Sequence, residues 1–563
     1  MTSSNINQDW NNVNLYHSAR ECDETKVTFE STLPIWLNGT LFRNGPGHFE
    51  LDNEDPPTTV YHSFDGFAYV QKYVINGENN EIKFQTTFVK SRMYEESLKE
   101  KKLYARTFGT DPCKSIFGRF QSLFIKNKGP KTFTDDTGVT IQRINNELVA
   151  LTETIIGYII DESTMETIAP LITLPYAKPI QSEIMTLTTA HVMYDVKRHM
   201  TVGYASRITR SKGYWLDVIF IHDDAVDEEK NEQVKSADVD DEDDITIHRK
   251  FTAFTNTMSE RGKAYNRNIK SKTKVYRFDY DNPCYMHSAS ISEDYLILSE
   301  IPLHFSLVNA AWATVAGGIL TDMFKWNGAT CPTYFRIISL DNGQEIARIP
   351  GPSFFTFHHI NAYQVTTDDA DEIVVDICAY DDHRLVRELY LDKLRANIFP
   401  SGLGYIRRFN LNLKLKQCTE PSENKNELPE QEYIGHPIGY RNSLVPVPIE
   451  LPRINSDYIG KSYRYVYAVR GPPNYMFDAL VKIDLQTQTV SGLWIEPCTS
   501  PSEPIFVPKP NSTEEDEGVV LTVVLEQKRK QSFILILDGQ SFKEITRAYL
   551  PISVPLSFHG NFY

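Results

Sequence analysis

The sequence predicts an all-β fold, for which a β-propeller is the favoured architecture and a large β-sandwich assembly is the alternative. Short runs rich in β-branched and aromatic residues recur along the chain, and Gly, Pro, Asn or Asp bound them. Many of these runs come in pairs joined by a compact turn, and few segments have a helical pattern. A propeller suits such hairpins because radial repetition leaves few sheet edges exposed.

The strand-like runs are spread over most of the chain. They lie at 67–75, 147–153, 295–301, 372–380, 463–469, 518–526 and 532–538. A strand, an Asp-containing turn and a second strand follow one another at 335–349, 480–494 and 533–550. This loose hairpin repeat has the form expected of four-stranded blades, although it carries no strict sequence signature.

Three further segments break the β pattern. Helical patterns occur at 91–108 and at 306–326, and the second is apolar with many small residues. The stretch 222–244 is strongly acidic and poor in aromatic residues. Such a composition predicts a solvated, mobile loop, with metal binding as the less favoured alternative.

The segment 108–131 combines aromatic and basic side chains in an otherwise acidic protein. Phe117, Phe120 and Phe124 alternate with basic residues, of which Lys114 is the first. This pattern predicts an amphipathic helix that lies on the surface of a lipid membrane. An ordinary packed helix is the alternative.

Composition narrows the class of function. The net charge of −16 argues against a nucleic-acid partner, because phosphate contacts need a basic surface. Seven cysteines without a CxxC pair fit reduced thiols rather than a zinc ribbon. The polar N-terminus and the lack of a run of about 20 apolar residues predict a cytoplasmic protein, attached to membranes at most peripherally.

Four histidines stand in aromatic or β-rich contexts: His191, His287, His358 and His559. They are too far apart in the sequence to share one helix face, so only a closed or radially repeated fold can bring them together. The likeliest reason for four histidines to meet is a metal. Neutral imidazoles suit zinc, copper, iron or nickel, and four ligands in an octahedron leave two positions for other molecules.

A metal held by neutral ligands alone needs carboxylates nearby, which accept the Nδ1–H bonds and fix the imidazole tautomers. Three glutamates lie in apolar or Pro-rich settings: Glu153, Glu450 and Glu503. Taken singly, each of these glutamates is better explained by a position at the surface or in a turn.

Seven motifs resemble the carotenoid cleavage oxygenase family, in particular its animal branch, and they cover nearly the whole chain. They are LPIWLNGTLFRNGPG (33–47), YHSFDGFAYV (61–70), TDPCKSIFGRF (110–120), TETIIGYIIDESTMETI (152–168), FHHINAY (357–363), PSEPIFVP (501–508) and FHGNF (558–562). The resemblance implies that residues 1–563 form a single seven-bladed propeller domain, with a helical cap over an iron(II) on its axis.

The resemblance also implies roles for particular residues. The iron ligands would be His191, His287, His358 and His559, with His358 chosen over the adjacent His359. Glu153, Glu450 and Glu503 would support these ligands, and Thr152 and Glu153 would be catalytic. Phe108, Thr152 and Tyr285 would line the substrate tunnel. Cys113, at the start of the predicted membrane segment, would be a possible acylation site.

The implied activity is dioxygen-dependent cleavage of a carotenoid double bond, which gives retinal-type aldehydes. Similarity to the insect carotenoid isomerooxygenase favours central 15,15′ cleavage coupled to trans-to-11-cis isomerisation. Three alternatives stay open: a retinoid isomerohydrolase acting on all-trans retinyl esters, a non-catalytic carotenoid-binding protein, and cleavage of stilbene-like or apocarotenoid substrates.

Overall fold

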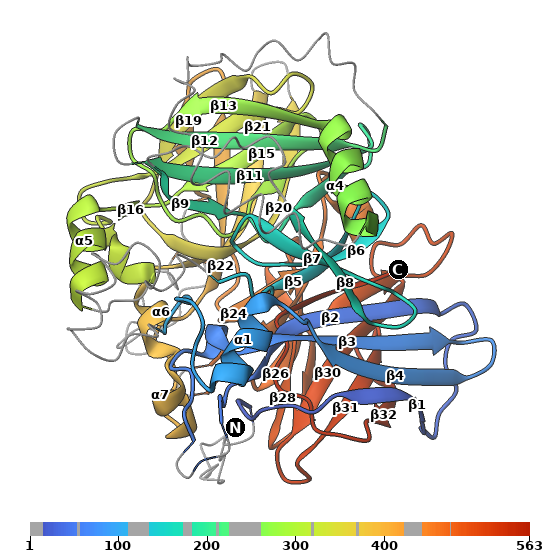
Figure 1. Ribbon diagram of the computed structural model, residues 1–563. Helices are drawn as coiled ribbons and strands as arrows, with labels where there is room; N and C mark the ends of the chain where they lie inside the picture. Colours follow the sequence, from blue (N-terminus) through green and yellow to red (C-terminus); the bar gives the residue numbers. More distant parts are fainter. Residues whose placement is uncertain are drawn as a thin grey trace.

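Seven antiparallel sheets are arranged as the blades of a β-propeller (Figure 1). The computed structural model describes residues 15–52, 54, 57–110, 134–172, 183–209, 213–224, 260–316, 320–366, 371–421, 442–472 and 475–563. Both the all-β prediction and the choice of a propeller over a sandwich are confirmed. Each run predicted as a strand corresponds to a β-strand whose bounds differ from the prediction by at most two residues.

The blades follow one another along the chain. The first contains β1 (Cys22–Val27), β2 (Asn38–His48), β3 (Phe67–Asn76) and β4 (Glu81–Phe88), together with the last strand, β33 (His559–Phe562). The second is β5 (Thr140–Ile144), β6 (Glu147–Leu151), β7 (Ile156–Ile160) and β8 (Thr167–Ile172). The third is β9 (Glu183–Thr188), β10 (Met193–Asp195), β11 (Met200–Thr209), β12 (Tyr214–His222) and β13 (Thr273–Asp279).

Four more blades complete the ring. The fourth is β14 (Ser290–Ile291), β15 (Tyr295–Glu300), β18 (Thr333–Ser339) and β19 (Glu345–Gly351), and the fifth is β20 (Phe355–Thr366), β21 (Asp371–Tyr380), β22 (Tyr405–Asn412) and β23 (Gln417–Thr419). The sixth is β24 (Ile449–Arg453), β25 (Tyr465–Arg470), β26 (Ala479–Asp484) and β27 (Thr489–Ile495). The seventh is β28 (Thr499–Pro501), β29 (Ile505–Pro508), β30 (Gly518–Glu526), β31 (Gln531–Asp538) and β32 (Glu544–Tyr549).

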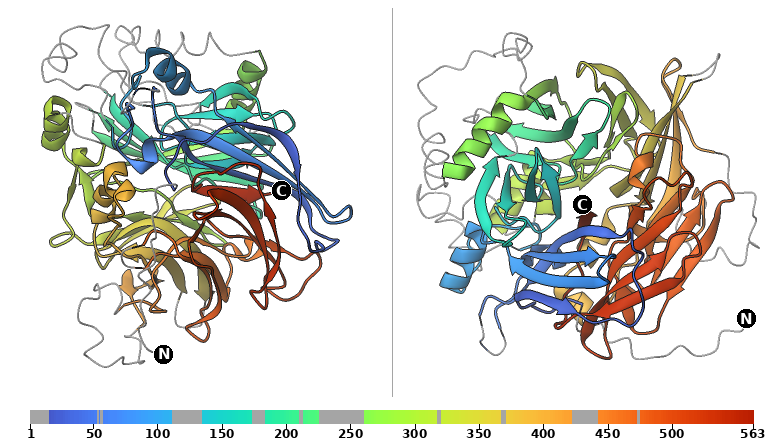
Figure 2. Two further views of the ribbon diagram at one scale, coloured as in Figure 1. Left: turned by 90° about the horizontal axis from the view of Figure 1, so that it is seen from below. Right: turned by 90° about the vertical axis from the view of Figure 1, so that its right-hand side faces the viewer.

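The innermost strands of the blades contact one another and form the inner wall of the ring. β14 contacts β20, β20 contacts β24, and β33 contacts both β29 and β5. The ring is closed by β33, which pairs with β2 and places Asn44 opposite His559 and Arg43 opposite Gly560. The C-terminus therefore lies near the middle of the ring (Figure 2, right). Any residue on these inner strands is brought close to the propeller axis.

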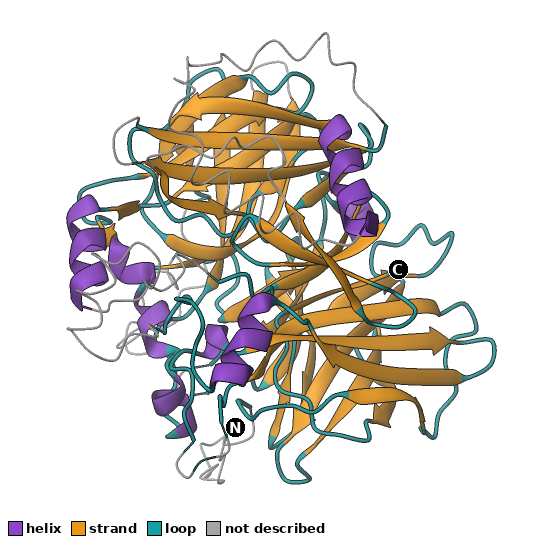
Figure 3. Cartoon of the chain, viewed as in Figure 1, coloured by secondary structure: helices purple, strands orange, loops and turns teal. Residues whose placement is uncertain are grey.

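The helices are short and lie outside the ring (Figure 3). They are α1 (Arg92–Glu100), α4 (Glu260–Lys272), α5 (Leu307–Ala316), α6 (Arg384–Glu388) and α7 (Leu391–Arg395). α4 packs against β8 and β12, whereas α5, α6 and α7 lie together on another side and, with neighbouring loops, form a cap.

Both predicted helices begin where expected, but their predicted lengths are wrong. The Ser91 side chain accepts a hydrogen bond from the main-chain N–H of Tyr94 and so caps α1, which ends at Lys101 in a left-handed conformation rather than at 108. The segment predicted as one helix over 306–326 divides into α5, the 3₁₀ turn Leu320–Met323 and β17 (Phe324–Trp326). β17 is a strand because it pairs with β16 (Leu303–Phe305) in a small separate sheet.

Candidate metal centre

The structure brings the four predicted histidines together at the centre of the ring. His191 follows β9, His287 precedes β14, His358 lies in β20 and His559 begins β33. One ring nitrogen from each lies within 4.8 Å of the others. The Nε2 atoms of His191 and His287 are 2.9 Å apart, and those of His358 and His559 are 3.3 Å apart. Four imidazoles with converging nitrogens form a site that a single metal ion can occupy.

His358 rather than His359 belongs to this cluster. The pairing of β20 with β21 shifts register between Thr356 and His359, and such a bulge re-aims the side chains around it. His359 points elsewhere, because its Nδ1 lies 3.0 Å from the hydroxyl of Ser290.

Each of the three predicted glutamates is hydrogen-bonded to a different histidine. The distances from carboxylate oxygen to Nδ1 are 2.6 Å for Glu153 and His287, 2.6 Å for Glu450 and His358, and 2.9 Å for Glu503 and His559. A carboxylate at Nδ1 keeps the proton on that atom, so Nε2 is left free to bind a metal.

Further donors hold the glutamates in place. The hydroxyl of Tyr285 donates to Glu153 (2.7 Å) and that of Tyr380 to Glu450 (2.6 Å). The main-chain N–H of Gly560 donates to Glu503 (2.9 Å).

These contacts decide the charge of two of the carboxylates. Burial alone raises the pKa of Glu450, but the attraction of His358 and the hydrogen bonds outweigh it and hold the pKa at about 2. Burial likewise raises the pKa of Glu503, yet Arg453 and His559 bring it down to about 2. Both carboxylates are therefore ionised at neutral pH.

Two of the four histidines, His191 and His559, favour the neutral form. Burial, followed by the proximity of His559 and His287, holds the pKa of His191 well below its ordinary value. Burial also lowers the pKa of His559 to about 4, although Glu503 opposes this change. Neutral imidazole is the form that coordinates a metal. His191 differs from the other three, because no carboxylate among the described residues is hydrogen-bonded to it.

The donor set fits iron(II), as it fits zinc, copper or nickel. Four neutral imidazoles carry no charge, and the three glutamates behind them offset the charge of a divalent ion without binding it directly. The site differs from the oxygen cages that calcium and magnesium prefer.

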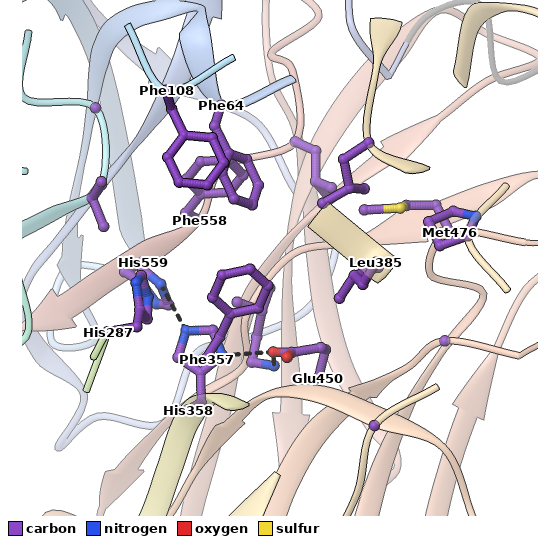
Figure 4. A pocket seen from close by; sticks show the side chains of 18 of the residues that line it. Phe64, Phe108, His287, Phe357, His358, Leu385, Glu450, Met476, Phe558 and His559 are labelled. Carbon is purple, nitrogen blue, oxygen red and sulfur yellow. Dashed lines mark hydrogen bonds and ion pairs between the residues drawn. The ribbon is translucent and has the colours of Figure 1, made fainter. Parts of the chain in front are cut away.

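A cavity opens beside the histidines, and its wall is largely apolar and rich in aromatic residues (Figure 4). All three predicted tunnel residues, Phe108, Thr152 and Tyr285, line it. The ring of Phe64 packs at 5.2 Å from those of Phe108 and Phe558. The cavity continues past Leu385 of α6 to Met476. Such a wall suits a long apolar molecule.

Several residues of this wall were not predicted from the sequence. Phe357 and Phe558 each precede a histidine of the cluster, so the repeated Phe-His pair was a signal that could have found them. Tyr380 and Leu451 carried no comparable signal. Two buried carboxylates, Asp65 and Asp136, also line the cavity.

Part of the membrane prediction lies outside the described residues. This applies to Cys113, Lys114, Phe117, Phe120 and Phe124, and also to most of the acidic stretch 222–244. In the part of the chain that the structure describes, none of the helices has the length and apolar character needed to cross a membrane.

Comparison with known proteins identifies the family. The family model of the retinal pigment epithelial membrane protein, RPE65, matches residues 16–563. A β,β-carotene 15,15′-dioxygenase of Gallus gallus is 30% identical over 95% of this chain and 95% of its own length. A mitochondrial carotenoid-cleaving dioxygenase of Macaca fascicularis is 28% identical over 94% of this chain and 90% of its own.

Solved structures agree on the fold. An ACO/RPE65 chimera superimposes with a TM-score of 0.73, and a cobalt-substituted Synechocystis ACO with 0.72. Each is 20% identical in sequence, and each comparison covers 98% of both chains. With its four-histidine centre and its full-length match to the family model, this chain belongs to the RPE65 family of carotenoid oxygenases.

Proposed function

We propose that this chain is an iron(II)-dependent dioxygenase that cleaves a double bond of a carotenoid with O₂. The observation that carries the proposal is the four-histidine cluster, three members of which (His287, His358 and His559) line a cavity rich in aromatic residues. One oxygen atom of O₂ ends in each of two carbonyl products, so the reaction consumes no further oxidant. The relatives that are named carotenoid dioxygenases support this choice of substrate.

The protein's own part in the reaction is to hold the metal and to place the polyene. His191, His287, His358 and His559 would bind iron(II), which when bound supplies the activation of dioxygen. Neutral imidazoles leave the ion its positive charge, and the ionised glutamates behind them stabilise that charge in a buried site.

Thr152 and Glu153 adjoin each other on the cavity wall, beside His287. We assign Glu153 to orienting His287, and Thr152 to facing the bound substrate and dioxygen. The aromatic rings exclude water and offer their faces to positive charge that develops along the polyene. The cavity thus fixes which double bond lies beside the metal.

Within this activity we favour central 15,15′ cleavage, coupled to trans-to-11-cis isomerisation, with retinal-type aldehydes as products. Isomerisation needs a polyene whose double bonds are weakened, as they are when the polyene carries positive charge. The faces of the aromatic rings around the cavity stabilise such a charge. The dioxygenase of Gallus gallus, named for the 15,15′ bond, supports the choice of bond.

The test is to replace His287 with alanine and to supply defined substrates. The iron-loaded wild-type protein should cleave β-carotene or zeaxanthin to retinals, and the variant should lose both iron and cleavage. Full iron content and full turnover in the variant would disprove the assignment. Release of 11-cis retinol from all-trans retinyl ester would instead identify an isomerohydrolase, and tight carotenoid binding without turnover would identify a carrier.

We also propose that the protein is cytoplasmic and attaches peripherally to membranes, from which a carotenoid must be drawn. Helix α5 supports this proposal, because Val308 is 78% exposed and Trp312 71% exposed, one turn apart, and Leu307 adjoins them. The next segment is tied to the cavity, since the main-chain N–H of Leu320 donates to the carbonyl of Phe108 (2.9 Å). An exposed apolar helix face at this place suits the surface of a bilayer.

The membrane proposal can be tested by liposome sedimentation. Trp312→Glu should reduce binding to liposomes several-fold, because it places a charge on the apolar face of α5. Ile495→Glu is the control, since Ile495 is an equally apolar, 50% exposed residue on the outer strand β27. Equal binding of both variants would contradict the role of α5.

A further inference from the structure

A chain of hydrogen bonds runs from the cavity wall to one of the four histidines. Tyr380 is the last residue of β21, and Glu450 lies in β24 of the next blade. The Tyr380 hydroxyl donates to Oε1 of Glu450 (2.6 Å), while Oε2 of the same carboxylate lies 2.6 Å from Nδ1 of His358. Tyr380 and His358 therefore contact different oxygens of the same carboxylate.

The backbone reinforces this arrangement. The main-chain N–H of Leu451 donates to Oε2 of Glu450 (2.6 Å), and Leu451 has a φ of +50°, in the left-handed region that residues with a side chain rarely adopt. The pairing of β24 with β25 shifts register between Glu450 and Arg453. Strained conformations of this kind persist where the surrounding structure requires them, commonly at functional sites.

Without the Tyr380 hydroxyl, the Oε1 atom would keep only the thiol of Cys378, at 3.8 Å, as a side-chain partner among the described residues. A thiol is a weak donor. The carboxylate plane would then be free to turn about the bond that holds Oε2.

Tyr285 and Glu153 form a related pair, but with a different geometry. There the tyrosine hydroxyl (2.7 Å) and Nδ1 of His287 (2.6 Å) meet the same oxygen, Oε1. Two contacts on one oxygen fix that atom, whereas contacts on both oxygens fix the orientation of the whole carboxylate. Tyr380 therefore constrains its glutamate more than Tyr285 does.

We propose that Tyr380 is a positioning residue that acts through Glu450 on His358 and so sets how well the four-histidine site holds its metal. The inference rests on the proposed function, because it takes the histidines to be metal ligands. The ring of Tyr380, which is 3% exposed, also lines the cavity. Tyr380 thus lies between the cavity and His358, to which it is linked by two hydrogen bonds through Glu450.

The chain offers a matched control. The hydroxyl of Tyr463 donates to Asp376 (2.7 Å), and this buried phenol–carboxylate bridge joins the same two blades as Tyr380 and Glu450 do. Asp376 lies in β21, the strand that ends at Tyr380. Tyr463→Phe and Tyr380→Phe therefore remove the same chemical group from the same interface, but only Tyr380→Phe reaches the histidine cluster.

The experiment is a titration of the full-length apoprotein with Co²⁺, followed by the visible absorption bands of the bound ion. Tyr380→Phe should bind Co²⁺ about ten-fold more weakly than wild type, the lower end of the effect seen when a group behind a ligand is removed, and its bands should shift. Tyr463→Phe should match wild type in both respects. Unchanged or tighter binding by Tyr380→Phe, with unchanged bands, would overturn the proposal.

Carotenoid cleavage by the wild type, measured separately, distinguishes this proposal from the proposed function. If the wild type cleaves a carotenoid while Tyr380→Phe leaves Co²⁺ binding untouched, only the role of Tyr380 fails. If the wild type binds Co²⁺ and Tyr380→Phe weakens that binding, but no carotenoid is cleaved, the positioning role stands and the proposed activity fails.

Discussion

Asp136 provides a prediction of pH-dependent stability. Its carboxylate is buried on the cavity wall and accepts a hydrogen bond from the main-chain N–H of Ala68 (3.1 Å). Burial raises the pKa of Asp136 from 3.8 to about 7, and the neighbouring charge of Asp135 adds to the rise. We consider the substitution Asp136→Asn, which has nearly the same shape and cannot ionise.

The direction in which stability changes with pH depends on how many protons the folded and unfolded states bind. Between pH 3.8 and about 7 the folded protein keeps a proton on Asp136 that the unfolded chain has released, so the free energy of unfolding falls as the pH rises. The fall is about 1.4 kcal/mol per pH unit and reaches about 4 kcal/mol above pH 7. Asp136→Asn removes this contribution. The variant should therefore gain stability relative to wild type as the pH is raised from 4 to 8.

The assay is urea unfolding of both proteins, in the absence of added metal, at pH 5, 6, 7 and 8. The quantity to compare is the difference in unfolding free energy between variant and wild type, because the titration of groups that do not interact with Asp136 cancels in it. The new amide can also change the free energy of unfolding by an amount that does not depend on pH. That change shifts the difference equally at every pH and leaves its dependence on pH unaltered. A difference that stays flat from pH 5 to pH 8 would refute the assignment of a raised pKa to Asp136.

Three other predictions concern ring closure and the metal. Gly560→Ala should destabilise the protein by about 1–3 kcal/mol and weaken Co²⁺ binding, because an added Cβ would lie 2.5 Å from the carbonyl oxygen of Phe42. Urea unfolding and Co²⁺ titration measure the two effects. Gly203→Ala is the control in both assays, because its added Cβ would have its nearest neighbour at 3.5 Å. Arg43→Met should cost about 1.5–3 kcal/mol in urea unfolding, because the buried guanidinium donates a hydrogen bond to the backbone carbonyl of Glu503 (2.8 Å). No measurable loss of stability would contradict this. Saturating Fe²⁺ at a thousand times its dissociation constant should raise the free energy of unfolding by about 4 kcal/mol, and a variant with alanine at all four histidines should show no such rise.

The middle strands of the blades could be predicted from the sequence because they are buried on both faces. β30 and β31 are apolar almost without interruption, and they were found with the correct bounds or within one residue. Helix α4 was missed because only Gly262, Tyr265 and Ile269 of its otherwise polar sequence are buried. Three buried positions do not distinguish a helix from a polar loop.

The candidate site was only partly visible in the sequence. The four histidines could be singled out by context, but their meeting depends on blades that lie far apart in the chain, and it was the family resemblance that brought them together. Tyr380 could not be found, because its contact with Glu450 depends on how two neighbouring blades pack. No short-range pattern encodes that packing.

The pairing of β33 with β2 has a consequence for the order in which the site is made. His559 is synthesised 201 residues after His358. At roughly 5–20 residues per second, a nascent chain carries three of the four histidines for about 10–40 seconds before the fourth exists. During this time β2 lacks its partner on the closing side, so its edge is open to other strands and to chaperones. The pairing of β33 with β2 covers this open edge and, in the same step, brings His559 to the other three histidines.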